Sequence, residues 1–158
     1  MGSEIERKFL TQSDDYKNMS KGVPYMQGYI CSGKGRVVRV RIAGAKGYIT
    51  IKGPHEGIKR AEYEYEIPVD DAREMLENLC TKPLIEKHRY SVPHEGFIWE
   101  IDEFHGENEG LVVAEIELDN ENQKFSIPSW IGKEVTGESK YYNSSLIKNP
   151  YTKWDSVI

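Results

Sequence analysis

The chain has 158 residues, of which 38% are hydrophobic and 30% charged, and its formal net charge is −5. This length suits one domain spanning residues 1–158, with a core that folds without disulfide or metal staples. The sequence has no run of five or more basic residues, which argues against a nucleic-acid partner. Cys31 and Cys80 are isolated, and no apolar run approaches the roughly 20 residues of a membrane helix. We therefore expect a soluble, cytoplasmic protein with no membrane partner.

Most of the chain alternates polar and apolar residues in short segments separated by Gly, Pro, Asn or Asp, which predicts antiparallel strands. The connections between these segments are mostly short and contain glycine, as hairpin turns do. The eight predicted strands are 3–10, 25–31, 35–42, 46–52, 59–67, 82–92, 97–104 and 111–118.

Helical signals are fewer. Residues 68–80 predict a helix, because Asp70 and Asp71 stand near its start and apolar residues follow at helical spacing. Shorter helices are predicted at 14–20, at 120–125 and at 142–149, the last ending before Pro150. Strands with inserted helices indicate an α+β domain built on an antiparallel sheet.

Charged residues fall on one face of strand after strand. Residues two apart in a strand point to the same side, so Glu4, Glu6 and Lys8 share a face that excludes Ile5 and Phe9. Later strands repeat this pattern with couplets that are mostly all acidic or all basic. They are Arg39 and Arg41, Thr50 and Lys52, Glu62 and Glu64, Lys87 and Arg89, Glu100 and Asp102, and Glu115 and Glu117.

Two arrangements explain such couplets. Each strand could be half exposed, with its polar face in water. The separation of acids from bases favours an eight-stranded antiparallel β-barrel with a charged interior, an apolar outside and a few flanking helices. The aromatic residues of the opposite faces would then pack beneath those helices. They are Tyr63, Tyr65, Tyr90 and Trp99.

A charged interior needs ligands of opposite charge. Like charges brought together away from water cost several kcal/mol each, so the acidic couplets require divalent cations and the basic ones a highly charged anion. A polyphosphate with Mg²⁺ or Mn²⁺ satisfies both, because carboxylate oxygens suit these hard cations. The predicted phosphate-binding residues are Arg39, Arg41, Lys52, Lys87 and Arg89.

The segment Glu4-Ile5-Glu6-Arg7-Lys8 has the form E-x-E-x-K, and the ordered couplets follow it through to Lys140. This series resembles the CYTH superfamily, the triphosphate tunnel metalloenzymes. The segment 27–29 and the tail 134–141 look closest to short bacterial members, which are usually triphosphatases. The resemblance implies an eight-stranded tunnel in which Lys140 joins the phosphate-binding residues. It also implies that Mg²⁺ or Mn²⁺ is held by Glu4, Glu6, Glu115 and Glu117.

The leading hypothesis is metal-dependent hydrolysis of a triphosphate, which is inorganic tripolyphosphate or a nucleoside or thiamine triphosphate. Lys8 is predicted to contact the reacting phosphoryl group, with Tyr29 as a hydrogen-bonding neighbour. A second metal would take further ligands from Glu62, Glu64, Glu100 and Asp102. An adenylyl cyclase and a non-catalytic polyphosphate-binding module remain alternatives, and homodimer formation is left open.

Overall fold

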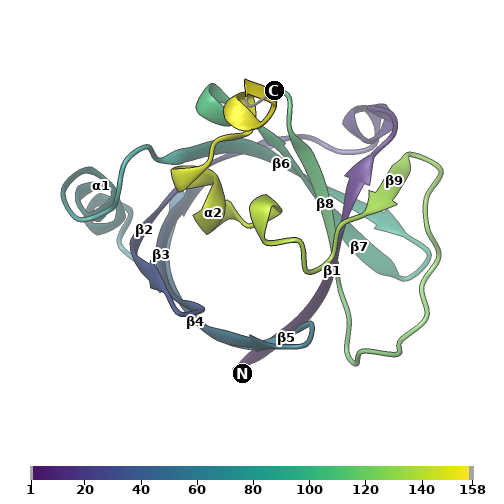
Figure 1. The fold of residues 1–158 in the computed structure, drawn as a ribbon, viewed down its shortest axis with the longest axis horizontal. Coiled ribbons are helices and arrows are strands. Elements are labelled where there is room, and N and C mark those ends of the chain that lie inside the picture. The colour runs from purple at the N-terminus through teal and green to yellow at the C-terminus, as the bar shows by residue number, and fades with distance from the viewer. Residues whose placement is uncertain (1, 157–158) are drawn as a thin grey trace.

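One antiparallel sheet of nine strands dominates the computed structural model, which describes residues 2–156 (Figure 1). Its order is β5-β4-β3-β2-β6-β7-β8-β1-β9, and an additional pairing of β5 with β1 closes eight of the strands into a ring. The strands are β1 (Ser3–Thr11), β2 (Val23–Gly33), β3 (Arg36–Ala43), β4 (Lys46–Glu56), β5 (Lys59–Ile67), β6 (Ile85–His94), β7 (Phe97–Phe104), β8 (Val112–Glu117) and β9 (Ile131–Glu134). The predicted closed sheet of eight antiparallel strands is therefore confirmed.

The helices agree with the sequence less well. The predictions at 68–80 and 142–149 correspond to α1 (Val69–Asn78) and α2 (Asn143–Lys148). The segment 14–20 forms only the 3₁₀ helix η1 (Asp15–Asn18), and the helix predicted at 120–125 is wrong, because a turn and extended chain stand there. The remaining 3₁₀ helices are η2 (Gly106–Asn108), η3 (Ser139–Tyr141) and η4 (Tyr151–Ser156).

Two strand predictions also needed correction. The strand β9 was missed, and it pairs with β1 alone rather than joining the ring. The strand predicted from residue 82 begins at Ile85, because Pro83 has no N–H to offer a neighbouring strand.

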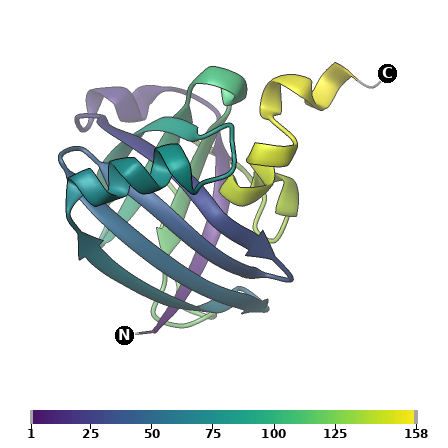
Figure 2. The same cartoon turned by 90° about the vertical axis from the view of Figure 1, so that its left-hand side faces the viewer.

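The apolar core lies outside the ring, since alternation in each strand directs one face inward and the other outward. On one side α1 packs its buried residues Ala72 and Leu76 against Val40 of β3. On another side Trp99 of β7 and Phe9 of β1 meet the rings of Phe125 and Trp130, which belong to the segment that follows β8. Helices and loops thus cover the outward faces only in part (Figure 2).

The expectation that four outward aromatic residues pack beneath helices is wrong for three of them. Tyr63 and Tyr65 of β5 are 44% and 60% exposed, because α1 packs mainly on β3 and β4 and meets β5 near its end at Ile67. Trp99 is fully buried, but beneath the loop that carries Phe125 rather than beneath a helix. Tyr90 contacts the Tyr16 ring of η1 at 5.2 Å between centroids.

The C-terminal segment crosses one opening of the ring. In Figure 1, η3 and α2 are drawn across the space that the strands enclose, and Figure 2 shows them at one end of the sheet. Leu146 and Ile147 anchor α2 in a buried cluster that includes Tyr29 of β2 and Ile85 of β6. Within residues 2–156, no helix has the length and apolar character needed to cross a membrane.

Candidate active site in the ring

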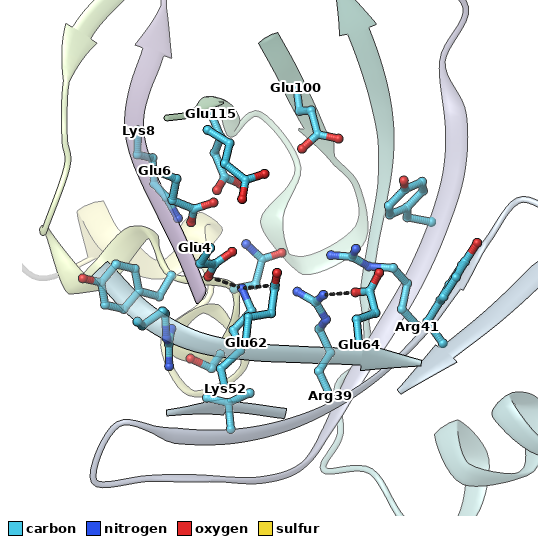
Figure 3. Close-up of a pocket in the computed structure, with 18 of the residues that line it drawn as sticks. Glu4, Glu6, Lys8, Arg39, Arg41, Lys52, Glu62, Glu64, Glu100 and Glu115 are labelled. Atoms are coloured by element: carbon cyan, nitrogen blue, oxygen red, sulfur yellow. Dashed lines mark hydrogen bonds and ion pairs between the residues drawn. The ribbon is translucent and has the colours of Figure 1, made fainter. Parts of the chain in front are cut away.

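A cavity of about 350 Å³ lies inside the ring and is lined mainly by charged side chains. Figure 3 shows Glu4, Glu6 and Glu115 turned toward this space from one side and Arg39 and Arg41 from another. The predicted site residues that line it are Glu4, Glu6, Lys8, Tyr29, Arg39, Arg41, Lys52, Glu62, Glu64, Lys87, Arg89, Glu100, Glu115 and Glu117. The charged faces inferred from alternation therefore do meet around one space.

The acidic side of the cavity is built by β1 and β8. Their antiparallel register places Glu6 opposite Glu117 and Lys8 opposite Glu115. Burial raises the pKa of Glu6 well above its usual range, and the charges of Glu115 and Glu4 and a hydrogen bond with Glu115 add to the effect. Burial, followed by the charges of Glu4 and Glu62, also raises the pKa of Glu117. Negative charge is therefore in excess on this side of the cavity.

The carboxylates can be tested for their fit to a metal. Among the described residues, no group of three or more His, Cys, Asp or Glu is arranged as a complete metal site. Mg²⁺ rarely uses such a cage, since it binds through one or two carboxylates together with water and substrate phosphate oxygens. The half-buried pair of Glu6 and Glu115, joined by a hydrogen bond, provides hard oxygen donors of that kind. The donor set fits Mg²⁺ or Mn²⁺.

The basic side of the cavity carries an excess of positive charge. Burial lowers the pKa of Arg41 to about 10, and the neighbouring charges of Arg39 and Arg89 contribute. Burial also lowers the pKa of Lys87 well below its usual range. The Nε atom of Arg39 is buried and has no hydrogen-bond partner among the described residues. Buried cations with unused donors favour an anion that accepts several hydrogen bonds.

Four carboxylates predicted as further metal ligands contact these cations. Asp102 lies in the buried layer behind the cavity and accepts hydrogen bonds from Lys87 Nζ at 2.7 Å and from Arg89 Nε at 2.7 Å. Glu64 accepts from Thr50 Oγ1 at 2.8 Å and from Arg39 Nη2 at 3.3 Å. Glu62 lies 3.4 Å from Lys52, and Glu100 lies 3.4 Å from Arg89. These four carboxylates orient the bases, and the geometry gives no support to a second metal.

Lys52 and Lys8 join the two sides of the cavity. The Nζ atom of Lys52 donates to Glu4 Oε1 at 2.8 Å. Lys8 is buried, and although burial lowers its pKa, the charges of Glu115 and Glu6 raise it above the usual value. Lys8 is therefore a cation held among carboxylates, on the same strand as Glu4 and Glu6.

Lys140 is not brought to this group. It is exposed, and its Nζ atom lies 4.7 Å from the centroid of the Trp154 ring and 5.3 Å from that of Tyr141. These rings belong to the C-terminal helices, which turn Lys140 away from the cavity. The predicted phosphate contact of Lys140 has no support in this geometry.

Several uncharged residues of the cavity wall were missed. Tyr25 lies under two arginines, with guanidinium groups 5.0 Å (Arg41) and 4.9 Å (Arg89) from its ring centroid. Alternation along β2 provides a signal for Tyr25, because it shares a face with Tyr29. The ring of Tyr142, which precedes α2, stacks on His55 of β4 at 5.3 Å between centroids. No sequence pattern connects those two residues.

Comparison with known proteins adds independent information. The sequence profile of the CYTH domain matches residues 2–151. The chain belongs to the CYTH family. This CYTH chain is 61% identical over 151 residues to an inorganic triphosphatase of Acetivibrio thermocellus, covering 96% of the chain and 97% of that protein. It is 36% identical over 149 residues to an inorganic triphosphatase of Nitrosomonas europaea, covering 91% and 96%.

Solved structures show the same fold. The crystal structure of an inorganic triphosphatase matches the CYTH chain with a TM-score of 0.65 at 33% identity, covering 90% of this chain and 96% of that one. A putative adenylate cyclase from Bacillus halodurans matches with a TM-score of 0.60 at 18% identity, covering 77% and 84%. At that identity the second match shows the fold alone.

Proposed function

We propose that this protein is a divalent-metal-dependent triphosphatase that hydrolyses inorganic triphosphate inside the ring. The observation that carries the proposal is the cavity itself, where carboxylates on β1 and β8 face arginines and lysines on β3 and β6, most of which are buried. A linear anion of high charge together with divalent cations neutralises both sides. The two inorganic triphosphatases described above support this choice of substrate.

The residues of the basic side would bind the phosphate chain. Arg39, Arg41, Lys87 and Arg89 present donors from two strands, and the bidentate geometry of arginine suits phosphate oxygens. Because phosphoryl transfer depends mainly on positioning and electrostatic stabilisation, a fixed set of buried cations contributes directly to the rate.

On the acidic side, Glu6 and Glu115, with Glu4 and Glu117 beside them, would hold Mg²⁺ or Mn²⁺. The bound ion would neutralise phosphate oxygens and polarise the reacting phosphoryl group. Lys8 lies among these carboxylates and would place its ammonium group against the same phosphoryl group.

The test uses purified protein with tripolyphosphate and Mg²⁺ or Mn²⁺. The wild type should release phosphate, and Glu6→Gln or Lys8→Ala should lower kcat/KM by about 100-fold or more, the scale of one lost charge-stabilising group. Glu74→Gln and Lys133→Ala change exposed residues in the same chemical way and should have no effect. Phosphate release that is unaffected by Glu6→Gln and Lys8→Ala would contradict the site.

ATP and tripolyphosphate together separate the alternatives. A triphosphatase that accepts ATP yields ADP and phosphate, whereas a cyclase yields cyclic AMP and pyrophosphate. Calorimetric binding of tripolyphosphate without turnover under either metal would identify a binding module instead.

A further inference from the structure

Asn143, the first residue of α2, lies against the basic side of the cavity although it is far from β2 and β6 in sequence. Its Oδ1 atom accepts a hydrogen bond from Lys87 Nζ at 2.9 Å and another from Gln27 Nε2 at 3.0 Å. Lys87 and Gln27 are almost completely buried. One side-chain oxygen from the C-terminal segment thus serves two buried donors of the ring.

The direction of each hydrogen bond follows from the chemistry of the groups. Arg41 can only donate, so its Nε atom, 3.0 Å from Gln27 Oε1, fixes which end of the Gln27 amide is the acceptor. The Gln27 NH₂ group must then donate, and it points to Asn143 Oδ1 and, at 3.2 Å, to the Tyr29 hydroxyl. Lys87, also a donor only, meets Asn143 on one side and Asp102 on the other.

Two separate hydrogen-bonded connections from basic residues therefore meet at the Oδ1 atom of Asn143. One connection runs from Arg41 through the Gln27 amide, and the other is the direct hydrogen bond from Lys87. Lys87 has three N–H donors, two of which are used by Asn143 and Asp102, which leaves the third for a ligand in the cavity that Lys87 lines.

We propose that Asn143 is a positioning residue that aims Lys87 and, through Gln27, Arg41 at the phosphate chain. This inference rests on the proposed function of the cavity and assigns a part of the site to α2, outside the charged couplets. Asn143 acts through these bases and takes no part in the chemical step.

The expected effect follows from what Asn143→Ala removes. Gln27 and Lys87 would each lose a buried acceptor, and the Lys87 ammonium would turn toward Asp102 alone. Because these bases grip the substrate before and during reaction, KM for tripolyphosphate should rise about 10- to 100-fold, the scale of lost hydrogen bonds to charged groups, with a smaller fall in kcat. Asn149→Ala, the same change at an exposed position in the same segment, should leave both constants unchanged.

A double-mutant cycle tests whether Asn143 acts through Lys87. Lys87→Met removes the ammonium group and keeps the length of the side chain. In that background Asn143→Ala should weaken tripolyphosphate binding clearly less than it does in the wild type, because only the contact through Gln27 to Arg41 is then left to lose. Dissociation constants are measured by calorimetry in EDTA, and melting temperatures establish that each variant is folded.

The outcomes are distinct. Wild-type protein that binds tripolyphosphate without hydrolysing it would refute the proposed function, while the binding cycle would still decide the role of Asn143. An Asn143→Ala variant that melts earlier but keeps the wild-type KM and dissociation constant would show a structural role only. Equal losses from Asn143→Ala with and without Lys87 would likewise overturn the proposal.

Discussion

At the scale of single residues, Asp102 explains how so many buried cations remain in the ring. It contacts Lys87 through one oxygen and Arg89 through both, at 2.7 to 2.9 Å. Burial opposes ionisation of this carboxyl, but the charges and hydrogen bonds of Arg89 and Lys87 hold the pKa of Asp102 far below its usual value. The group stays ionised and keeps both cations in fixed directions.

Asp102→Asn should therefore lower the free energy of unfolding by about 3 kcal/mol at pH 7, because it removes the anion between two buried cations. A depressed pKa stabilises the folded state above the unfolded pKa, which is about 4 for Asp, and this contribution disappears as pH falls below it. The gap between wild type and variant should be full at pH 7 and shrink below about pH 4, as measured by urea denaturation. Glu74→Gln makes the same change from carboxylate to amide at an exposed residue of α1 and should cost less than about 1 kcal/mol.

Most charged residues of the cavity were predictable from the sequence, whereas its neutral residues from the C-terminal segment were not. Couplets such as Glu115 and Glu117 repeat every second position and show their shared face directly. Asn143 and Tyr142 lie in a short C-terminal segment with no such repeat, and their partners Gln27 and His55 are about 90 or more residues away in sequence. Only the closed ring brings them together.

At the scale of elements, the fit between α1 and the sheet depends on a missing side chain. An added Cβ at Gly47 of β4 would lie 2.8 Å from the Cβ of Ala72 and 3.1 Å from the carbonyl oxygen of Ile67. Both contacts are too short, and one involves backbone that cannot turn away. The helix can approach β4 this closely because residue 47 is glycine.

Gly47→Ala should destabilise the fold by about 1 to 3 kcal/mol, the usual cost of overpacking. Gly33→Ala makes the same substitution in β2, where nothing lies within 4 Å of the added Cβ, and should change stability by less than about 0.5 kcal/mol. Thermal or urea denaturation of the two variants measures the difference. Equal losses in both would show that the contact with α1 is not the cause.

Element prediction succeeded where a pattern was long enough to repeat. The ring strands were found from alternation, and the amphipathic α1 was found from its helical spacing. The strand β9 has four residues, one of them Gly132, and owes its conformation to pairing with β1 rather than to its own sequence. The false helix at 120–125 fails for a similar reason, since Phe125 is drawn into the aromatic cluster around Trp99.

At the scale of the whole molecule, the ring encloses opposite charges on opposite sides, and its acidic side has more carboxylates than neighbouring cations. Mg²⁺ should consequently raise the melting temperature of the wild type. At about 100 times its dissociation constant, one bound ion adds roughly 2.7 kcal/mol, or about 5 to 10 °C for a chain of this size. Scanning calorimetry in MgCl₂ against NaCl of equal ionic strength measures the shift. Glu6→Gln should lose most of it, and an unchanged shift would place the ion elsewhere.

The pairing of β1 with both β5 and β8 determines when the ring can form during synthesis on the ribosome. Glu4, Glu6 and Lys8 leave the ribosome first, but Glu115 and Glu117 follow more than a hundred residues later. At ordinary elongation rates this delay is roughly 5 to 20 s. Until then the first strand has no β8 beside it, and an incomplete chain has no active site. The ring can therefore close only after the eighth strand has been made, and the cavity is complete only after Asn143 follows.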